Sequence, residues 1–175
     1  MLLDAGVSAE RIDDRAADVR AECCRAYARL CTEDLSSTVL PGVRELLAWL
    51  SARDDVTLSL LTGNYEPVAR LKLARAGIGR YFPAGQGAFG SDAEDRAALP
   101  AIARRRAGTR GFPHPRAATV VIGDTPRDIA CAQADDLQCI AVATGPYRVS
   151  ELAAADLVVQ DAAELQAALA VELAV

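Results

Sequence analysis

The chain has 175 residues, 51% of them hydrophobic, which suits one domain with at most a small appendage and a well-buried core. Its net charge of −5 argues against nucleic acid as a partner, because binding a polyanion needs an extended basic face. No apolar run approaches the roughly 20 residues that span a bilayer, and no signal-peptide pattern opens the chain, so we expect a cytoplasmic protein without a membrane partner.

The first predicted element is a helix over residues 8–33. Apolar side chains recur there at helical spacing among many charges, namely Ile12, Val19, Cys23, Ala26, Tyr27 and Leu30. Such a stripe is typical of an ordinary amphipathic helix. A turn at residues 40–42 separates it from a second predicted helix over residues 43–50.

An apolar strand is predicted over residues 56–61, and it ends in Thr62, Gly63 and Asn64. Ligands bind at the carboxyl ends of parallel strands. A threonine hydroxyl, a glycine amide open to close approach and an asparagine amide suit phosphate oxygens. The alternative is that Thr62 and Asn64 only cap a turn.

A helix over residues 66–77 follows, with Gly77 as its C-terminal signal. It carries Lys72, the single lysine of the chain. A solvated position on the helix is one interpretation of Lys72.

Residues 85–90 match the pattern G-x-G-x-x-G, but no strand precedes them and acidic residues follow. We therefore reject a dinucleotide-binding fingerprint and expect a short strand or turn before an acidic helix start. The next predicted helix covers residues 94–107. Its basic run, Arg104-Arg105-Arg106, is interpreted as a solvated helix end.

A second polar strand end follows the buried run Val120–Ile122. Asp124 stands at the end of this strand, and Pro126 opens a helix with Asp128 in its first turn. Two carboxylates that converge in this way suit a hard cation such as Mg²⁺. The milder interpretation is that Asp124 caps the helix and Asp128 favours its N-terminal dipole.

The remaining elements continue the alternation of strands and helices. Asp135 and Asp136 stand at a helix end, where aspartate tolerates a left-handed backbone. Strands are predicted over residues 139–143 and 157–159, and a helix over residues 161–172. This order predicts an α/β fold, a Rossmann-like parallel sheet with helices on both faces.

The cysteines are Cys23, Cys24, Cys31, Cys131 and Cys139. Their odd number and the absence of a C-x-x-C pair argue against a disulfide framework, so we interpret them as small buried hydrophobes. Cys131 lies close behind the acidic loop. The only histidine, His114, stands between prolines in a predicted loop, so no Cys-His nucleophile is supported.

Residues 60–64 and 123–128 together resemble the second motif and the fourth, GDxxxD, motif of the haloacid dehalogenase (HAD) superfamily. Most members are Mg²⁺-dependent phosphohydrolases. Residues 71–78 and 140–147 also resemble the phosphatases of that superfamily. The resemblance implies a partial helical cap over residues 1–38 and a HAD-like α/β core over residues 39–175.

The resemblance also implies roles for individual residues. Asp124 and Asp128 would bind Mg²⁺, and a small phosphorylated metabolite would be the substrate. The catalytic residues would be Thr62, Lys72 and Asp124, and the substrate-binding residues Thr62, Gly63, Asn64 and Lys72. Arg96 is the alternative to Lys72 as the cation, and Asp92 could edge the site.

One departure concerns the nucleophile, which in this superfamily lies in an N-terminal DxDxT motif after the first strand. No Asp-x-Asp occurs in this chain. Residues 1–6 are superficially similar, but Gly6 stands where the acid/base aspartate should be, so we do not assign Asp4 as the nucleophile. The motif's strand would lie between the strands ending at Thr62 and Asp124.

We therefore expect a core that lacks its first strand, through a shortened gene model, a true truncation or divergence. Phosphatase activity should be absent or impaired. The strands on either side of the missing one should pair directly or expose a seam, through which the protein could self-associate.

Three alternatives remain. Dehalogenation is known in the same superfamily but needs no Mg²⁺, so the acidic pair argues against it. A non-catalytic module that binds a phosphorylated metabolite or a partner chain would retain the phosphate-binding residues. A receiver-like signalling domain is disfavoured by the Thr62-Gly63-Asn64 loop and by the lack of adjacent acids near the expected first strand.

Overall fold

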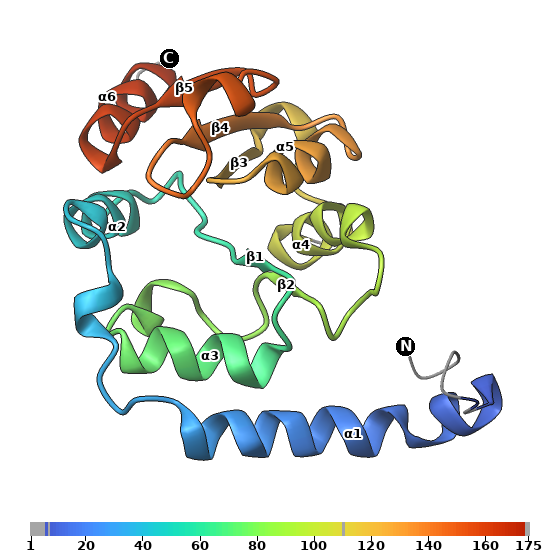
Figure 1. Ribbon diagram of the computed structural model, residues 1–175. Coiled ribbons are helices and arrows are strands. Elements are labelled where there is room, and N and C mark those ends of the chain that lie inside the picture. The colour runs from blue at the N-terminus through green and yellow to red at the C-terminus, as the bar shows by residue number, and fades with distance from the viewer. Residues whose placement is uncertain (1–5, 7, 110, 174–175) are drawn as a thin grey trace.

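The computed structural model describes residue 6, residues 8–109 and residues 111–173 (Figure 1). The described helices are α1 (Ala9–Leu30), α2 (Val43–Ser51), α3 (Glu66–Arg75), α4 (Leu99–Ala107), α5 (Pro126–Gln133) and α6 (Ala162–Glu172). The described strands are β1 (Leu61–Thr62), β2 (Ala88–Phe89), β3 (Val120–Gly123), β4 (Gln138–Val142) and β5 (Leu157–Val159). Short 3₁₀ turns include η1 (Ser36–Thr38) and η3 (Arg96–Ala98).

Strands β3, β4 and β5 form a parallel sheet in that order, with helices on both faces. Side chains of β4 alternate between the faces, as the pleat of a strand requires. Ile140 and Val142 pack in one cluster with residues of α2 and α6. Cys139 and Ala141 pack in a second cluster with α5. The predicted parallel α/β fold with helices on both faces is confirmed.

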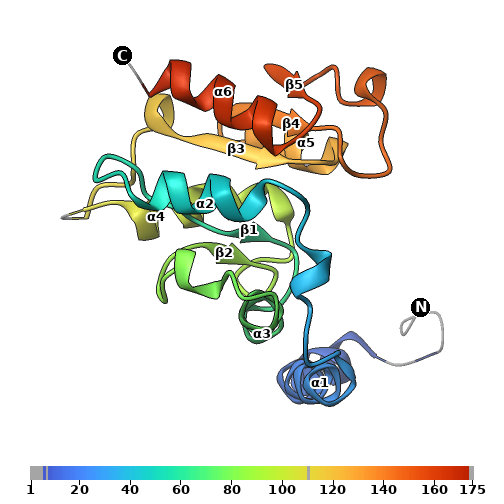
Figure 2. The same ribbon diagram turned by 90° about the vertical axis from the view of Figure 1, so that its left-hand side faces the viewer.

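Strands β1 and β2 form a separate parallel pair of two residues each. The predicted strand over residues 56–61 is wrong in extent, because only Leu61 of that range is in a strand. A strand needs a hydrogen-bonding neighbour along its length, and no described strand pairs with residues 56–60. Figure 2 places β1 next to β3 in the order of strands, yet no ladder joins them.

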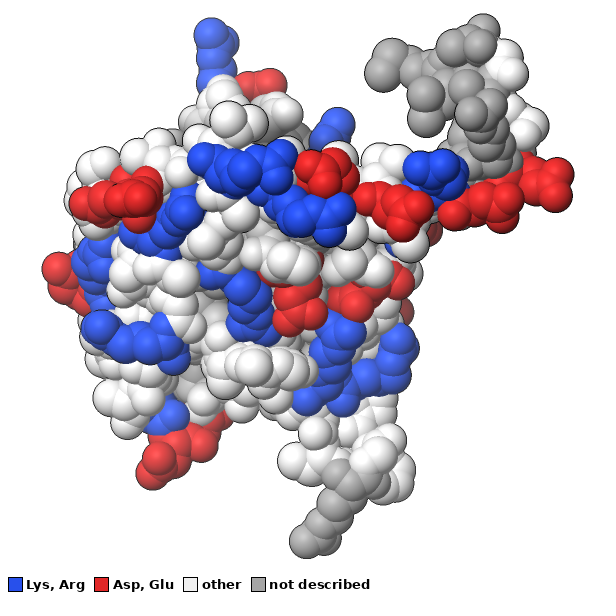
Figure 3. All heavy atoms as spheres, turned by 90° about the horizontal axis from the view of Figure 1, so that it is seen from below, with Lys and Arg blue, Asp and Glu red and all other residues white. Residues whose placement is uncertain are grey.

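Helix α1 lies along the outside of α3 (Figures 1 and 2). Its stripe is only partly covered, since Val19 is 57% exposed and Leu30 is 85% exposed. On the face seen from below, where α1 lies, acidic and basic side chains are interspersed (Figure 3). The expected domain division at residue 38 stays a prediction. None of the described helices is both long and apolar enough to cross a membrane.

The basic run was interpreted as solvated, and this is wrong for Arg104. Its side chain is 8% exposed and forms two hydrogen bonds with Asp135, itself 5% exposed. Arg116 is a second partner of the same carboxylate. These guanidinium groups hold the pKa of Asp135 below its usual value, with Arg104 the larger cause. The pair joins α4 to the end of α5, where Asp136 adopts the expected left-handed backbone (φ 52°).

Candidate active site

The loop between β3 and α5 is held by a capping box. Thr125 is the N-cap, and its hydroxyl accepts from the Asp128 amide at 3.3 Å. Asp128 Oδ2 accepts in return from the Thr125 hydroxyl at 2.8 Å and from the amides of Thr125 and Asp124. Gly123 makes this possible, because a Cβ there would lie 2.3 Å from the Asp128 Cβ. Asp128 therefore closes the start of α5 through this capping box.

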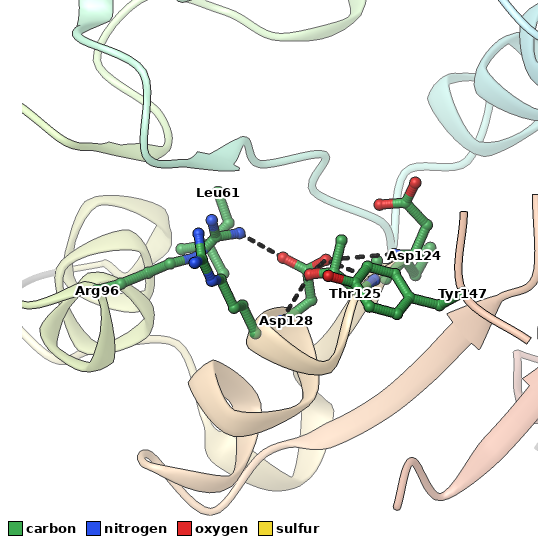
Figure 4. A pocket seen from close by; sticks show the side chains of 9 residues that line it. Leu61, Arg96, Asp124, Thr125, Asp128 and Tyr147 are labelled. Atoms are coloured by element: carbon green, nitrogen blue, oxygen red, sulfur yellow. Dashed lines mark hydrogen bonds and ion pairs between the residues drawn. The ribbon is translucent and has the colours of Figure 1, made fainter. Parts of the chain in front are cut away.

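Asp124 is not the helix cap, since Thr125 occupies that position. Its side chain points away from Asp128 and toward the side of the hollow on which β1 lies (Figure 4). Within the described part of the chain, its carboxylate has no hydrogen-bond or ion-pair partner. Gly145 leaves room for it, because a Cβ there would lie 2.5 Å from Asp124 Oδ2. The loop thus presents one unpaired, half-buried carboxylate.

Arg96 connects the two strand ends. Its guanidinium forms an ion pair with Asp128, and its Nη1 would lie 3.7 Å from a Cβ added at Gly63, just after β1. Its Nε is buried and has no partner among the described residues. These groups surround a hollow of about 470 Å³, lined by Leu61, Arg96, Ile122, Gly123, Asp124, Thr125, Arg127, Asp128 and Tyr147.

The loop after β1 is organised by Asn64. Its backbone amide and its side-chain Nδ2 both donate to Thr62 Oγ1, at 3.1 and 2.9 Å. A hydroxyl has two acceptor sites and one proton, so these bonds leave the Thr62 proton available to a ligand. Lys72 Nζ donates to Asn64 Oδ1 at 3.1 Å and lies 5.2 Å from the centre of the Tyr27 ring on α1. Lys72 therefore belongs to the Thr62 loop and Arg96 to the acidic loop.

The residues offer a sparse but suitable donor set for Mg²⁺. Among the described residues, no group of three or more His, Cys, Asp or Glu side chains could hold a metal ion. Asp124 supplies the free carboxylate, while both oxygens of Asp128 already accept hydrogen bonds. Mg²⁺ is commonly held by one or two carboxylates, several waters and the phosphate of a substrate. Asp124 fits such a site, and the role of Asp128 as a ligand stays a prediction.

Other candidates stand outside this arrangement. Asp92 binds Arg106 and the Phe89 amide, which lowers its pKa, and it does not line the hollow. His114 Nδ1 lies 3.2 Å from Thr119 Oγ1. Asp4 lies outside the described residues.

The cysteines give no sign of a nucleophile. Cys131 and Cys139 are buried as expected, whereas Cys23 is exposed, contrary to expectation. Burial raises the pKa of Cys131, whose thiol donates to the Arg96 carbonyl, and raises the pKa of Cys139 to about 11. Burial thus disfavours the thiolate form, which is the nucleophilic form of cysteine.

Sequence reasoning missed two residues that shape the hollow. Tyr147 lines it and Gly145 makes room for Asp124. The signal was present, because the turn Thr144–Tyr147 follows the predicted strand over residues 139–143, and such strand ends gather ligands.

Comparison with known proteins agrees with this geometry. A family model described as haloacid dehalogenase-like hydrolase matches residues 6–133. A search of curated proteins finds no match to the chain. The family match covers more than half of the chain and includes both loops of the site. The chain belongs to the haloacid dehalogenase-like hydrolase family.

Proposed function

We propose that this chain binds the phosphate of a small phosphomonoester and belongs to a Mg²⁺-dependent phosphatase of the HAD family. The observation that carries this proposal is the unpaired Asp124 carboxylate, which shares one hollow with Leu61 of β1 and with the guanidinium of Arg96. A metal-binding carboxylate and cationic phosphate donors thereby converge between two strand ends.

Each residue has a separate task in this proposal. The Thr62 hydroxyl and the Gly63 amide donate to phosphate oxygens, and Asn64 holds the hydroxyl in place. Lys72 positions Asn64 and adds positive charge. Bound Mg²⁺ would neutralise charge on the phosphoryl group, and Asp124 is the residue that would hold it.

Arg96 supports a second cationic contact. Asp128 binds one of its terminal nitrogens, and the side chain of Arg96 lines the hollow beside this ion pair. A guanidinium can bind two phosphate oxygens at once, which the ammonium of Lys72 cannot do with the same geometry. We propose that Arg96 and Lys72 share the cationic role from opposite sides of the phosphate.

The covalent step requires a nucleophilic carboxylate that the described hollow does not provide. We propose that a strand seated between β1 and β3 would supply it, because those two strands have unpaired edges there. The same edges could also mediate self-association. Without a strand at these edges, the residues of the site suit phosphate binding without turnover. The second candidate function is therefore a non-catalytic module that binds a phosphorylated metabolite.

The test is an assay of the 175-residue protein with 4-nitrophenyl phosphate and Mg²⁺, beside a version extended at its N-terminus by a strand bearing DxDxT. We expect turnover only from the extended protein, and loss of that turnover in Asp124→Asn. The matched control is Asp54→Asn, an exposed aspartate in the turn after α2. Turnover by the 175-residue form that Asp124→Asn abolishes would refute the need for an added nucleophile. No turnover by the extended form would favour the binding module.

A further inference from the structure

A second hollow, of about 510 Å³, lies where α1, α2 and α3 meet, and we call it the junction pocket. It is lined by Tyr27, Leu35, Thr38, Val39, Leu40, Val43, Lys72, Leu73, Ala76 and Ile78. No carboxylate is among these lining residues, and seven of the ten are aliphatic. Its size falls within the range of small-molecule sites, about 300–1,000 Å³.

Lys72 places this apolar pocket beside the phosphate loop. Its side chain lines the junction pocket, and its ammonium donates to Asn64, which in turn holds Thr62. The Tyr27 ring lies against the same ammonium from α1. A ligand whose anionic end contacts the Lys72 ammonium would therefore meet the aliphatic wall with its other end, because Lys72 lines the pocket.

The walls of the pocket are held in place by two arginines. Arg75 of α3 donates to the carbonyls of Cys31 and Ala28 at the end of α1. Arg44 of α2 donates to the carbonyls of Ser36 and Ala76. These bonds fix α1, η1 and α2 against α3, so the pocket is present before any ligand binds.

The lining discriminates between classes of ligand. The Thr38 hydroxyl already donates to the Leu35 carbonyl at 2.7 Å. A sugar buried there would leave hydroxyl groups without hydrogen-bond partners, and burial of such groups is unfavourable. An alkyl or aryl group needs no partners and gains from leaving water.

We propose that the junction pocket receives the apolar group of the substrate, so that the substrate class is a phosphomonoester of an apolar alcohol. This inference rests on the proposed function, since the phosphate is placed at Thr62 and Lys72. It selects alkyl and aryl phosphates over sugar phosphates.

The probes are inorganic phosphate and ethyl, butyl and hexyl phosphate, titrated calorimetrically into the 175-residue protein. We expect the affinity to rise about fourfold for each added methylene, which corresponds to about 0.8 kcal/mol per buried CH₂. Binding of all four probes with equal affinity would overturn the pocket assignment and leave the phosphate site standing. Equally tight binding of hexanol and hexyl phosphate would show an apolar pocket with no phosphate end, and would overturn both proposals.

A filled pocket gives the second test. Val39→Trp should remove the gain in affinity from butyl to hexyl phosphate. The matched control is Val171→Trp on α6, at a side chain that is 70% exposed and outside the pocket. If Val39→Trp does not fold, Leu40→Trp tests the same point, because that side chain is 47% exposed at the pocket rim. If a folded pocket variant still binds hexyl phosphate more tightly than butyl phosphate by the same factor as the parent, the proposal is contradicted.

Discussion

In the β3–β4–β5 half of the molecule β4 is paired along both edges, whereas in the other half β2 is the only described strand that pairs with β1. The first half has strands of three to five residues, and the second has strands of two. The loops differ in the same way. Asp128 anchors its loop through a helix cap, while the Thr62 loop depends on side chains of Asn64 and Lys72. The ladder of β3 with β4 has four paired positions and precedes the capped loop, whereas the ladder of β1 with β2 has two and precedes the loop held by side chains.

The largest expected effect comes from separating the two halves. Arg104 on α4 and Asp135 after α5 form a buried ion pair between them. Arg104→Ala leaves a buried carboxylate with Arg116 alone, and losing one partner of such a pair costs about 3–5 kcal/mol. Urea unfolding should show this loss, while Arg105→Ala, the exposed neighbour, should unfold like the unmodified protein. Equal stability of the two variants would mean that the pair does not hold the halves together.

Acid should weaken the same junction. The pKa of Asp135 in the folded protein lies below its usual 3.8, so the folded state is stabilised above pH 3.8 and loses that stability as the pH falls through the lowered value. We expect the free energy of unfolding to fall more steeply below pH 4 in the unmodified protein than in Asp135→Asn. Parallel pH curves would contradict a charged Asp135 at the junction.

A smaller effect is expected within the better-paired half. Gly123→Ala would place a Cβ 2.3 Å from the Asp128 Cβ. The Asp128 Cβ is fixed to the backbone of the first turn of α5, so it can move away only if that turn moves with it. Overpacking of this kind costs about 1–3 kcal/mol. Thermal unfolding monitored by circular dichroism would measure the loss. A variant as stable as the parent would show that the capping box tolerates displacement.

The smallest effect on stability should come from Gly145→Ala. The new Cβ would lie 2.5 Å from Asp124 Oδ2, 3.2 Å from its Cγ and 3.4 Å from its Cβ, and the carboxylate has no partner among the described residues that would stop it from turning aside. We expect stability within about 0.5 kcal/mol of the parent, as for most substitutions without a buried conflict, but weaker Mg²⁺-dependent phosphate binding. Unchanged binding in this variant would mean that the orientation of Asp124 is unimportant.

The sequence predicted the well-paired half better, for a physical reason. Val120–Ile122, Pro126 and Asp136 carry local signals for a strand, a helix start and a left-handed turn, and all three are present. Residues 56–60 carry an equally apolar pattern. Whether they form a strand depends on a neighbouring strand to pair with, and an apolar pattern does not show whether such a strand is present.

The site shows the same limit. Thr62 and Asp124 were identified because each follows an apolar run. The bridge from Arg96 to Asp128 and the burial of Arg104 depend on contacts 32 and 31 residues away in the chain. No spacing in the sequence predicts such contacts. For this reason the sequence favours Lys72 over Arg96 as the cation of the site and indicates a solvated Arg104.

The most direct test of the convergence of the two loops is the affinity of the 175-residue protein for inorganic phosphate, measured by calorimetry with and without Mg²⁺. Thr62→Val should weaken binding about tenfold or more in both conditions, because a hydrogen bond to a charged group contributes roughly 1.5–3 kcal/mol. Asp124→Asn should remove the increase in phosphate affinity that Mg²⁺ causes and leave the affinity without Mg²⁺ unchanged. Phosphate binding that is indifferent to both substitutions would contradict a shared site between β1 and β3.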